Sequence, residues 1–231
     1  MNLSFEEIEH YASSILRDYT GGNVAEAVFP LNVEAFARDY LGLRLAYTRL
    51  SNTGNVLGLT TYADTDVELH RYCRVDKLRV AGDTILVDDS LVREIKARGQ
   101  RRYTIVHECS HHIFRRMKYA YEDRKTLRPT YELYTSPSKK TVAERNANAL
   151  AAALLMPPPQ IWVLMERFAR GRKLTSFEGR FNIPDKLALT HICSALKVSR
   201  AAAVIRLRQL GYLIVAPLDT FTDPMDVFCD E

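Results

Sequence analysis

The residues His107, Glu108 and His111 form the motif H-E-x-x-H in the middle of the chain. Residues i and i+4 of a helix lie on one face about one turn apart, so both imidazoles can bind the same ion. A Zn²⁺ ion held by two or three protein ligands lowers the pKa of a bound water molecule, and a neighbouring carboxylate can take the proton of that water. The motif therefore predicts a metal site with His107 and His111 as ligands and Glu108 as the base.

Two histidines leave such a site short of a ligand, and several acidic or imidazole side chains could supply the third. The candidates are Glu144, Glu132, Glu122, Asp123, His112, His70 and His191. Glu144 begins a predicted helix that could lie against the metal helix. It also fits a capping box, T-x-x-E, with Thr141, in which its carboxylate would bond backbone amides instead. The residues alone leave both roles open for Glu144, and Asn148, one turn on, could orient a ligand or form an interhelical hydrogen bond.

The metal motif is predicted to lie on a helix from about Gly99 to Lys118, because apolar residues flank the motif at helical spacing. Cys109 lies inside the motif, but its offset of two from His107 turns it away from the metal face, so we expect it in the core. A second strong helix is predicted at 141–156, where the alanine-rich sequence allows close packing against a neighbour. Three prolines, 157–159, end this helix.

Two helices and a few short strands are predicted before the metal helix. The helices are expected from Ser4 to near Gly21 and from Val33 to Leu41, and the strands at 43–47, 56–62 and 84–88. The segment 63–80 is polar and ambiguous, and 119–140 reads as a long polar connection. This order predicts an α+β fold in which a small mixed or antiparallel sheet lies beside the metal helix, with an edge able to hold an extended substrate.

The C-terminal third is predicted to be helical. A helix at about 160–170 is followed by a basic link, 171–179, and then by a helix-turn-helix over 184–213 in which Ser199 caps the second helix. Basic residues that could contact DNA phosphates there are Lys186, Lys197, Arg200, Arg206 and Arg208. We therefore expect a metallopeptidase-like domain at 1–170, a helix-turn-helix-like subdomain at 171–215 and an acidic tail at 216–231.

The composition is typical of a soluble globular protein, with 47% hydrophobic and 26% charged residues among 231. No apolar run approaches the roughly 20 residues that a membrane helix needs, and the acidic N-terminus is unlike a signal peptide. Without the five acids of the tail, the chain carries 32 basic and 23 acidic residues, which we expect to form a solvated surface. Four widely spaced cysteines favour a reducing, cytoplasmic setting: Cys73, Cys109, Cys193 and Cys229.

Two sequence blocks resemble the ImmA/IrrE family of zinc metallo-endopeptidases. The family pattern has an arginine-rich lead into F/Y-T-x-x-H-E-x-x-H, which runs here from Arg101 to His111. Its second block, E-x-x-A-N-x-x-A-x-x-L-L-M-P, runs here from Glu144 to Pro157, and looser similarity covers most of the chain. One departure is Cys109-Ser110, where members often have Leu-Gly.

The resemblance implies a zincin-like fold with His107, His111 and Glu144 as the ligands of one Zn²⁺ per chain, or of Mn²⁺, and Glu108 as the catalytic residue. It also implies a cytoplasmic endopeptidase that cleaves a helix-turn-helix repressor and so relieves repression in a mobile element or a stress regulon. A tyrosine of the long connection could stabilise the oxyanion, and the sequence does not choose among Tyr119, Tyr121, Tyr131 and Tyr134.

The alternative interpretation is a non-proteolytic, DNA-binding transcriptional regulator with a structural metal site. A structural zinc site usually has four protein ligands, whereas H-E-x-x-H with one glutamate leaves a position open. Because the open position favours the enzyme, we expect the protein not to bind DNA directly. We also expect it not to associate with a membrane, since the sequence has no long apolar run. The repressor, the scissile bond, the activating signal and the oligomeric state are not specified by the sequence.

Overall fold

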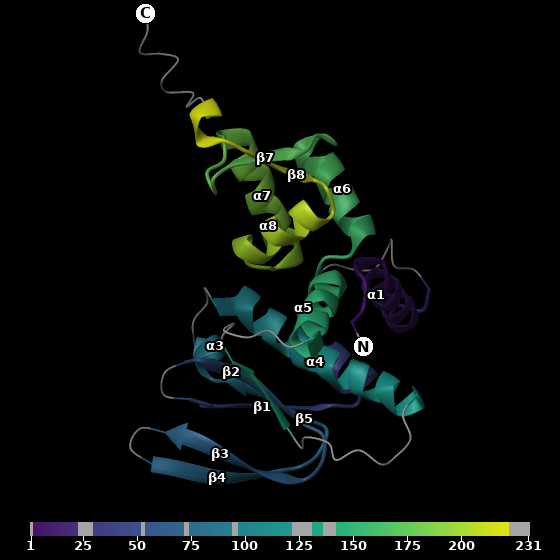
Figure 1. Ribbon diagram of the computed structural model, residues 1–231, viewed down its shortest axis with the longest axis vertical. Helices are drawn as coiled ribbons and strands as arrows, with labels where there is room; N and C mark the ends of the chain where they lie inside the picture. Colours follow the sequence, from purple (N-terminus) through teal and green to yellow (C-terminus); the bar gives the residue numbers. More distant parts are fainter. Residues whose placement is uncertain are drawn as a thin grey trace, which may run out of the picture. The chain divides into compact units, whose positions relative to one another are not determined.

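The computed structural model describes seven stretches of the chain, which are 2–22, 30–51, 54–71, 74–93, 97–121, 131–135 and 142–221. At residues 70, 71, 74, 118–121 and 131–135 it describes the backbone alone. The chain divides into two compact units, Met1–Leu155 and Met156–Glu231, here called unit 1 and unit 2 (Figure 1). The sequence-based division into 1–170, 171–215 and 216–231 stays a prediction.

Unit 1 contains a sheet, a hairpin and several helices. Its helices are α1 (Phe5–Tyr19), α2 (Val33–Ala35), the π-helix η1 (Phe36–Tyr40), α3 (Ser90–Arg93), α4 (Arg98–Tyr121) and α5 (Val142–Leu155). Its strands are β1 (Arg44–Thr48), β2 (Val56–Thr61), β3 (Thr65–Arg71), β4 (Arg74–Val80), β5 (Thr84–Asp88) and β6 (Tyr131–Thr135). The predicted α+β class, with a small mixed sheet beside the metal helix, is confirmed.

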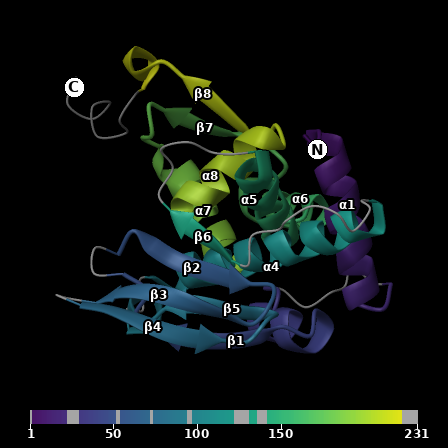
Figure 2. The same cartoon turned by 60° about the horizontal axis from the view of Figure 1, so that its bottom comes forward.

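The main sheet has the strand order β1-β5-β2-β6. Strand β1 runs parallel to β5, and β2 runs antiparallel to both of its neighbours. All five residues of β5 are buried, because helix α4 covers one face of the sheet and the β3–β4 hairpin covers the other (Figure 2). The sheet thus supports α4, the helix that carries the metal motif, through strands β2 and β5.

The β3–β4 hairpin occupies the segment that the sequence left ambiguous. Its inner face contributes Val67, Leu69 and Val80 to a buried cluster with residues of β2 and β5. Its outer face carries cross-strand ion pairs that are largely exposed, such as Asp66 with Arg79 at 3.3 Å. The alternation of polar and apolar residues expected of a strand is therefore present. It is hard to recognise in the sequence because many residues on the solvent side are charged.

The N-terminal helices follow their capping signals. Ser4 caps α1 in a capping box with Glu7, as the backbone N–H of each residue donates to the side chain of the other. Asn32 caps α2, but the predicted continuous helix 33–41 is divided, because α2 changes to the π-helix η1 after one turn. Figure 1 shows α1 beside α5, against which it packs.

Unit 2 is mainly helical. Its elements are α6 (Pro158–Ala169), β7 (Leu174–Phe177), α7 (Ile183–Leu196), α8 (Arg200–Gln209), β8 (Leu213–Ala216) and the 3₁₀ helix Leu218–Thr220. Helices α7 and α8 cross at 103°, and the Ser199 hydroxyl caps α8, so the predicted helix-turn-helix is confirmed. The short parallel pair β7–β8 was not predicted. Most of the predicted acidic tail, 222–231, lies outside the described residues.

The basic residues of this helix-turn-helix do not all face solvent. Lys186, Lys197, Arg200 and Arg208 are exposed, but Arg206 is 1% exposed and its Nε donates to the carbonyl oxygen of Met156 at 3.0 Å. The prediction that Arg206 contacts DNA phosphates is therefore wrong, because this side chain is part of the core of unit 2. Helical periodicity places Arg206 beside the apolar Ala203 and Leu207, which are also buried.

No single helix in the described part of the chain is both long and apolar enough to cross a membrane. Two pairs of consecutive helices, α5 with α6 and α7 with α8, meet this test of length and composition when each pair is counted together, but each pair is broken by a bend.

Candidate metal centre

Helices α4 and α5 bring His107, His111 and Glu144 together. The Nε2 atoms of the two histidines lie 3.1 Å apart. One carboxylate oxygen of Glu144 lies 3.4 Å from Nε2 of His107 and the other lies 3.3 Å from Nε2 of His111. Both imidazoles are buried, and the Glu144 side chain is 23% exposed. Of the seven candidates for the third ligand, Glu144 is the one that joins this group within the described residues.

These separations fit a tetrahedral ion. With zinc–ligand bonds of about 2.0–2.1 Å, two neighbouring ligand atoms of a tetrahedron lie about 3.3 Å apart. The Nε2 atoms of the two histidines, 3.1 Å apart, match one edge of such a tetrahedron, and each lies 3.3–3.4 Å from a different carboxylate oxygen of Glu144. The described residues supply three ligands to this group, which leaves one corner for water or substrate. Two imidazoles and one carboxylate suit Zn²⁺, and the same donor types occur in sites for other divalent ions.

The carboxyl group of Glu144 carries the negative charge that an anionic metal ligand needs. Burial raises the pKa of its carboxyl group, but hydrogen bonds with His107 and His111 outweigh burial and lower the pKa to about 2. The carboxylate is therefore ionised at neutral pH, as a metal ligand must be. Thr141, the partner in the alternative capping box, lies outside the described residues.

The two helices are joined by hydrogen bonds one turn from the candidate ligands. The Tyr103 hydroxyl donates to Oδ1 of Asn148 at 2.8 Å, and Nδ2 of Asn148 donates to the carbonyl oxygen of Glu144 at 2.7 Å. Asn148 therefore forms the interhelical hydrogen bond that the sequence allowed as one of its two roles. Ala147 and Ala151 are fully buried, which agrees with close packing of an alanine-rich helix.

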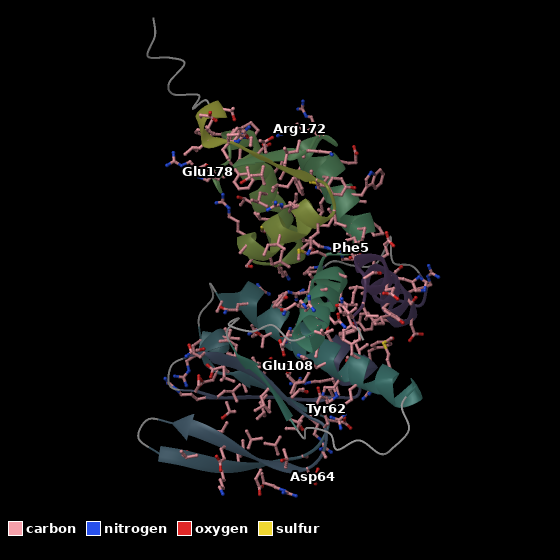
Figure 3. All side chains as sticks on the ribbon, viewed as in Figure 1. Phe5, Tyr62, Asp64, Glu108, Arg172 and Glu178 are labelled. Carbon is pink, nitrogen blue, oxygen red and sulfur yellow. The ribbon has the colours of Figure 1, made fainter. Side chains whose placement is uncertain are left out.

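Glu108 lies between α4 and the sheet (Figure 3). Its residue is 1% exposed, and its carboxyl group is directly beside Gly58 of β2. A Cβ atom built on Gly58 would lie 2.6 Å from Oε1 of Glu108. Sequence reasoning did not single out Gly58, although an isolated glycine inside a strand is a known sign of a close approach by another group.

Two other candidate histidines have different partners. Nδ1 of His112 lies 3.6 Å from Asp83, and its ring packs edge-on against Tyr62. Burial lowers the pKa of His112 to about 4, which agrees with a neutral, structural side chain. In unit 2, His191 stacks on Phe168 with ring centroids 4.9 Å apart. Cys109 is fully buried, and burial raises the pKa of its thiol, so its predicted place in the core is confirmed.

Several predicted candidates fall where the structure describes no side chain. Glu122 and Asp123 lie outside the described residues, and for His70 and Glu132 the backbone alone is described, in β3 and β6. The same holds for the four candidate oxyanion donors, Tyr119, Tyr121, Tyr131 and Tyr134. Strand β6 also lies inside the segment that was predicted to be a long connection, where its pairing with β2 extends the sheet.

Comparison with known proteins agrees with this geometry. No curated protein matches the chain. A model of a peptidase family, described as the IrrE N-terminal-like domain, matches residues 91–208. The match covers half of the chain and includes α4, α5 and the helix-turn-helix. The chain, with its H-E-x-x-H helix and a group of two histidines and one glutamate that could hold a metal ion, belongs to the metallopeptidase family of the IrrE N-terminal-like domain.

Proposed function

We propose that the protein is a metal-dependent endopeptidase in which His107, His111 and Glu144 hold one Zn²⁺ ion. The observation that carries this proposal is the meeting of two imidazoles and one carboxylate from two helices, close enough to share one ion, with the buried Glu108 next to His107 in the sequence. When bound, the ion would supply Lewis acidity to a carbonyl group and to water. Mn²⁺ is the alternative ion for this site.

Residues of the chain supply the proton transfers and the charges that the reaction needs besides the ion. Glu108 acts as general base by taking a proton from the attacking water, and as general acid by passing that proton to the leaving amine. The buried setting of Glu108 keeps bulk water away from its carboxylate, which strengthens the electrostatic interactions of this group. The histidines act as neutral ligands, and the ionised Glu144 supplies one negative charge.

We propose a helix-turn-helix transcriptional repressor as the substrate, and relief of repression as the result of cleavage. The support is the resemblance of both sequence blocks to the ImmA/IrrE endopeptidases and the family match. Because such a repressor acts on DNA, we expect the reaction to take place in the cytoplasm. Direct DNA binding by the protease is not part of this proposal.

The proposal is tested by mixing the zinc-loaded protein with candidate repressors, first of all with any small helix-turn-helix protein encoded by a neighbouring gene. We expect a single new cleavage product. Glu108→Gln should retain the metal and lose at least about 100-fold in rate, since general acid–base catalysis contributes that much or more. Glu178→Gln, the same substitution at an exposed glutamate, is the matched control. Wild-type cleavage by Glu108→Gln would contradict the mechanism.

A further inference from the structure

We propose that Gly58 of β2 is a positioning residue for Glu108, because its lack of a side chain leaves the space in which the carboxylate of the base lies. This inference rests on the proposed role of Glu108. Catalysis would then require a glycine in β2, about fifty residues before the metal motif in the sequence. The contact is between the sheet and the side of α4 that carries the base (Figure 3).

The space at Gly58 is already filled by α4. A Cβ atom there would lie 2.6 Å from Oε1 and 3.1 Å from Cδ of Glu108, and 2.7 Å from the Cγ2 methyl of Thr104. Carbon–carbon contacts in proteins are favourable at about 3.5–4.0 Å, so an alanine at this position would force a side chain of α4 to move. Glu108 and Thr104 are one helical turn apart and are both buried, which limits where either can go.

The backbone conformation does not explain this glycine. Seven of the described glycines have a positive φ, the region that favours glycine, and Gly58 is not among them. An alanine at 58 would therefore meet no backbone strain of that kind. The requirement at Gly58 is one of space alone, which makes the effect of a substitution specific to the groups that it touches.

A β-bulge in β2 lies next to Gly58. The register between β2 and β6 shifts between Val56 and Leu59. Both of these side chains pack in the cluster under the hairpin, although residues three apart in a regular strand point to opposite faces. The bulge absorbs the extra residue, so that Leu59 keeps its place in the core and Gly58 faces the base. Bulges of this kind often lie beside active sites.

The candidate metal ligands have a different set of contacts. His107 and His111 face Glu144 of α5, whereas Glu108 faces β2. Crowding at Gly58 should thus displace the base while the ligands stay in place. A displacement of about 1 Å in a catalytic group can cost about 100-fold in rate. We expect Gly58→Ala to bind one zinc ion with wild-type affinity, to keep its KM, and to lose about 10- to 100-fold in kcat.

The experiment compares Gly58→Ala with two further variants. Gly82→Ala is the matched control, because its Cβ would meet the backbone of Ala63 at 2.9 Å and crowds the fold without touching Glu108; its kcat should stay within twofold of wild type. Gly58→Ala/Thr104→Ser removes the methyl contact and leaves the contact with the carboxylate, so we expect its thermal stability to recover and its kcat to stay low.

A crystal structure of Gly58→Ala supplies a readout that does not depend on activity. We expect the Glu108 carboxylate to have moved and both imidazoles to have stayed in place. A Gly58→Ala protein that is folded and zinc-loaded and retains wild-type kcat would overturn the inference, and so would recovery of kcat by Thr104→Ser. Failure of the wild type to cleave any repressor would contradict the proposed function. The role of Gly58 is tested independently of cleavage, because an unmoved Glu108 in the crystal structure of Gly58→Ala would contradict it.

Discussion

The Tyr103 hydroxyl donates a 2.8 Å hydrogen bond to Oδ1 of Asn148, and this contact joins α4 to α5 one turn from the metal centre. Tyr103 precedes His107 by four residues, and Asn148 follows Glu144 by four residues. The ring of Tyr103 is also nearly parallel to that of His107, at 25°. The pair therefore joins the two helices close to the place where His107, His111 and Glu144, the candidate metal ligands, meet.

Removal of this hydroxyl should affect both stability and metal binding. We expect Tyr103→Phe to lower the free energy of unfolding by about 0.5–1.5 kcal/mol. The affinity for zinc should fall by about tenfold, because groups that orient ligands typically contribute that much. Urea titration and competition with a chelator measure the two effects, with Tyr47→Phe, at a partly exposed tyrosine of β1, as control. An unchanged zinc affinity would show that the pair does not position the ligands.

The ionisation of Glu144 should contribute to the stability of the metal-free protein. Its pKa is lowered from 4.5 to about 2 in the folded state, so the folded protein binds this proton less tightly than the unfolded chain does. The stabilisation is then present above about pH 4.5 and is lost as the pH falls towards about 2. We expect the difference in unfolding free energy between wild type and Glu144→Gln, both free of metal, to decrease across this range. A difference that is independent of pH would contradict the hydrogen bonding of the Glu144 carboxylate with the histidines.

Arg206 and Arg208 lie on the same helix, but Arg206 is buried and Arg208 is exposed. Substitutions at the two positions therefore compare a structural arginine with a surface arginine. Arg206→Ala should lower the free energy of unfolding by about 2 kcal/mol or more, because it removes a buried side chain and leaves the carbonyl of Met156 without this donor. Arg208→Ala removes the same charge from an exposed position and should change stability by less than about 0.5 kcal/mol. Equal effects of the two substitutions would contradict the structural role of Arg206.

The sequence predicts well those parts of the structure that depend on local patterns. The H-E-x-x-H helix, the alanine-rich α5 and the caps at Ser4 and Ser199 were all predicted, because periodicity and capping residues act within a few positions. The candidacy of Glu144 as a ligand also follows from its place at the start of α5. The position of Glu144 beside the two imidazoles depends on the packing of α4 against α5, which no local pattern contains.

Features that depend on distant contacts were missed. The role of Gly58 exists only because α4 packs on β2, and the β7–β8 pair joins two segments about forty residues apart. Arg206 was named among the basic residues that could contact DNA phosphates, and its burial depends on packing in unit 2 that brings it to the carbonyl oxygen of Met156. The β3–β4 hairpin was missed for a different reason, since its charged outer face made an amphipathic segment look like a polar loop.

The most direct test of the metal centre is the amount of zinc that each chain retains after dialysis, measured for the wild type, Glu144→Ala and the exposed control Glu178→Ala. If His107, His111 and Glu144 hold one ion between them, the wild type and the control retain one zinc per chain, and Glu144→Ala binds it at least about 100-fold more weakly. Retention of one zinc ion with wild-type affinity by Glu144→Ala would contradict the account.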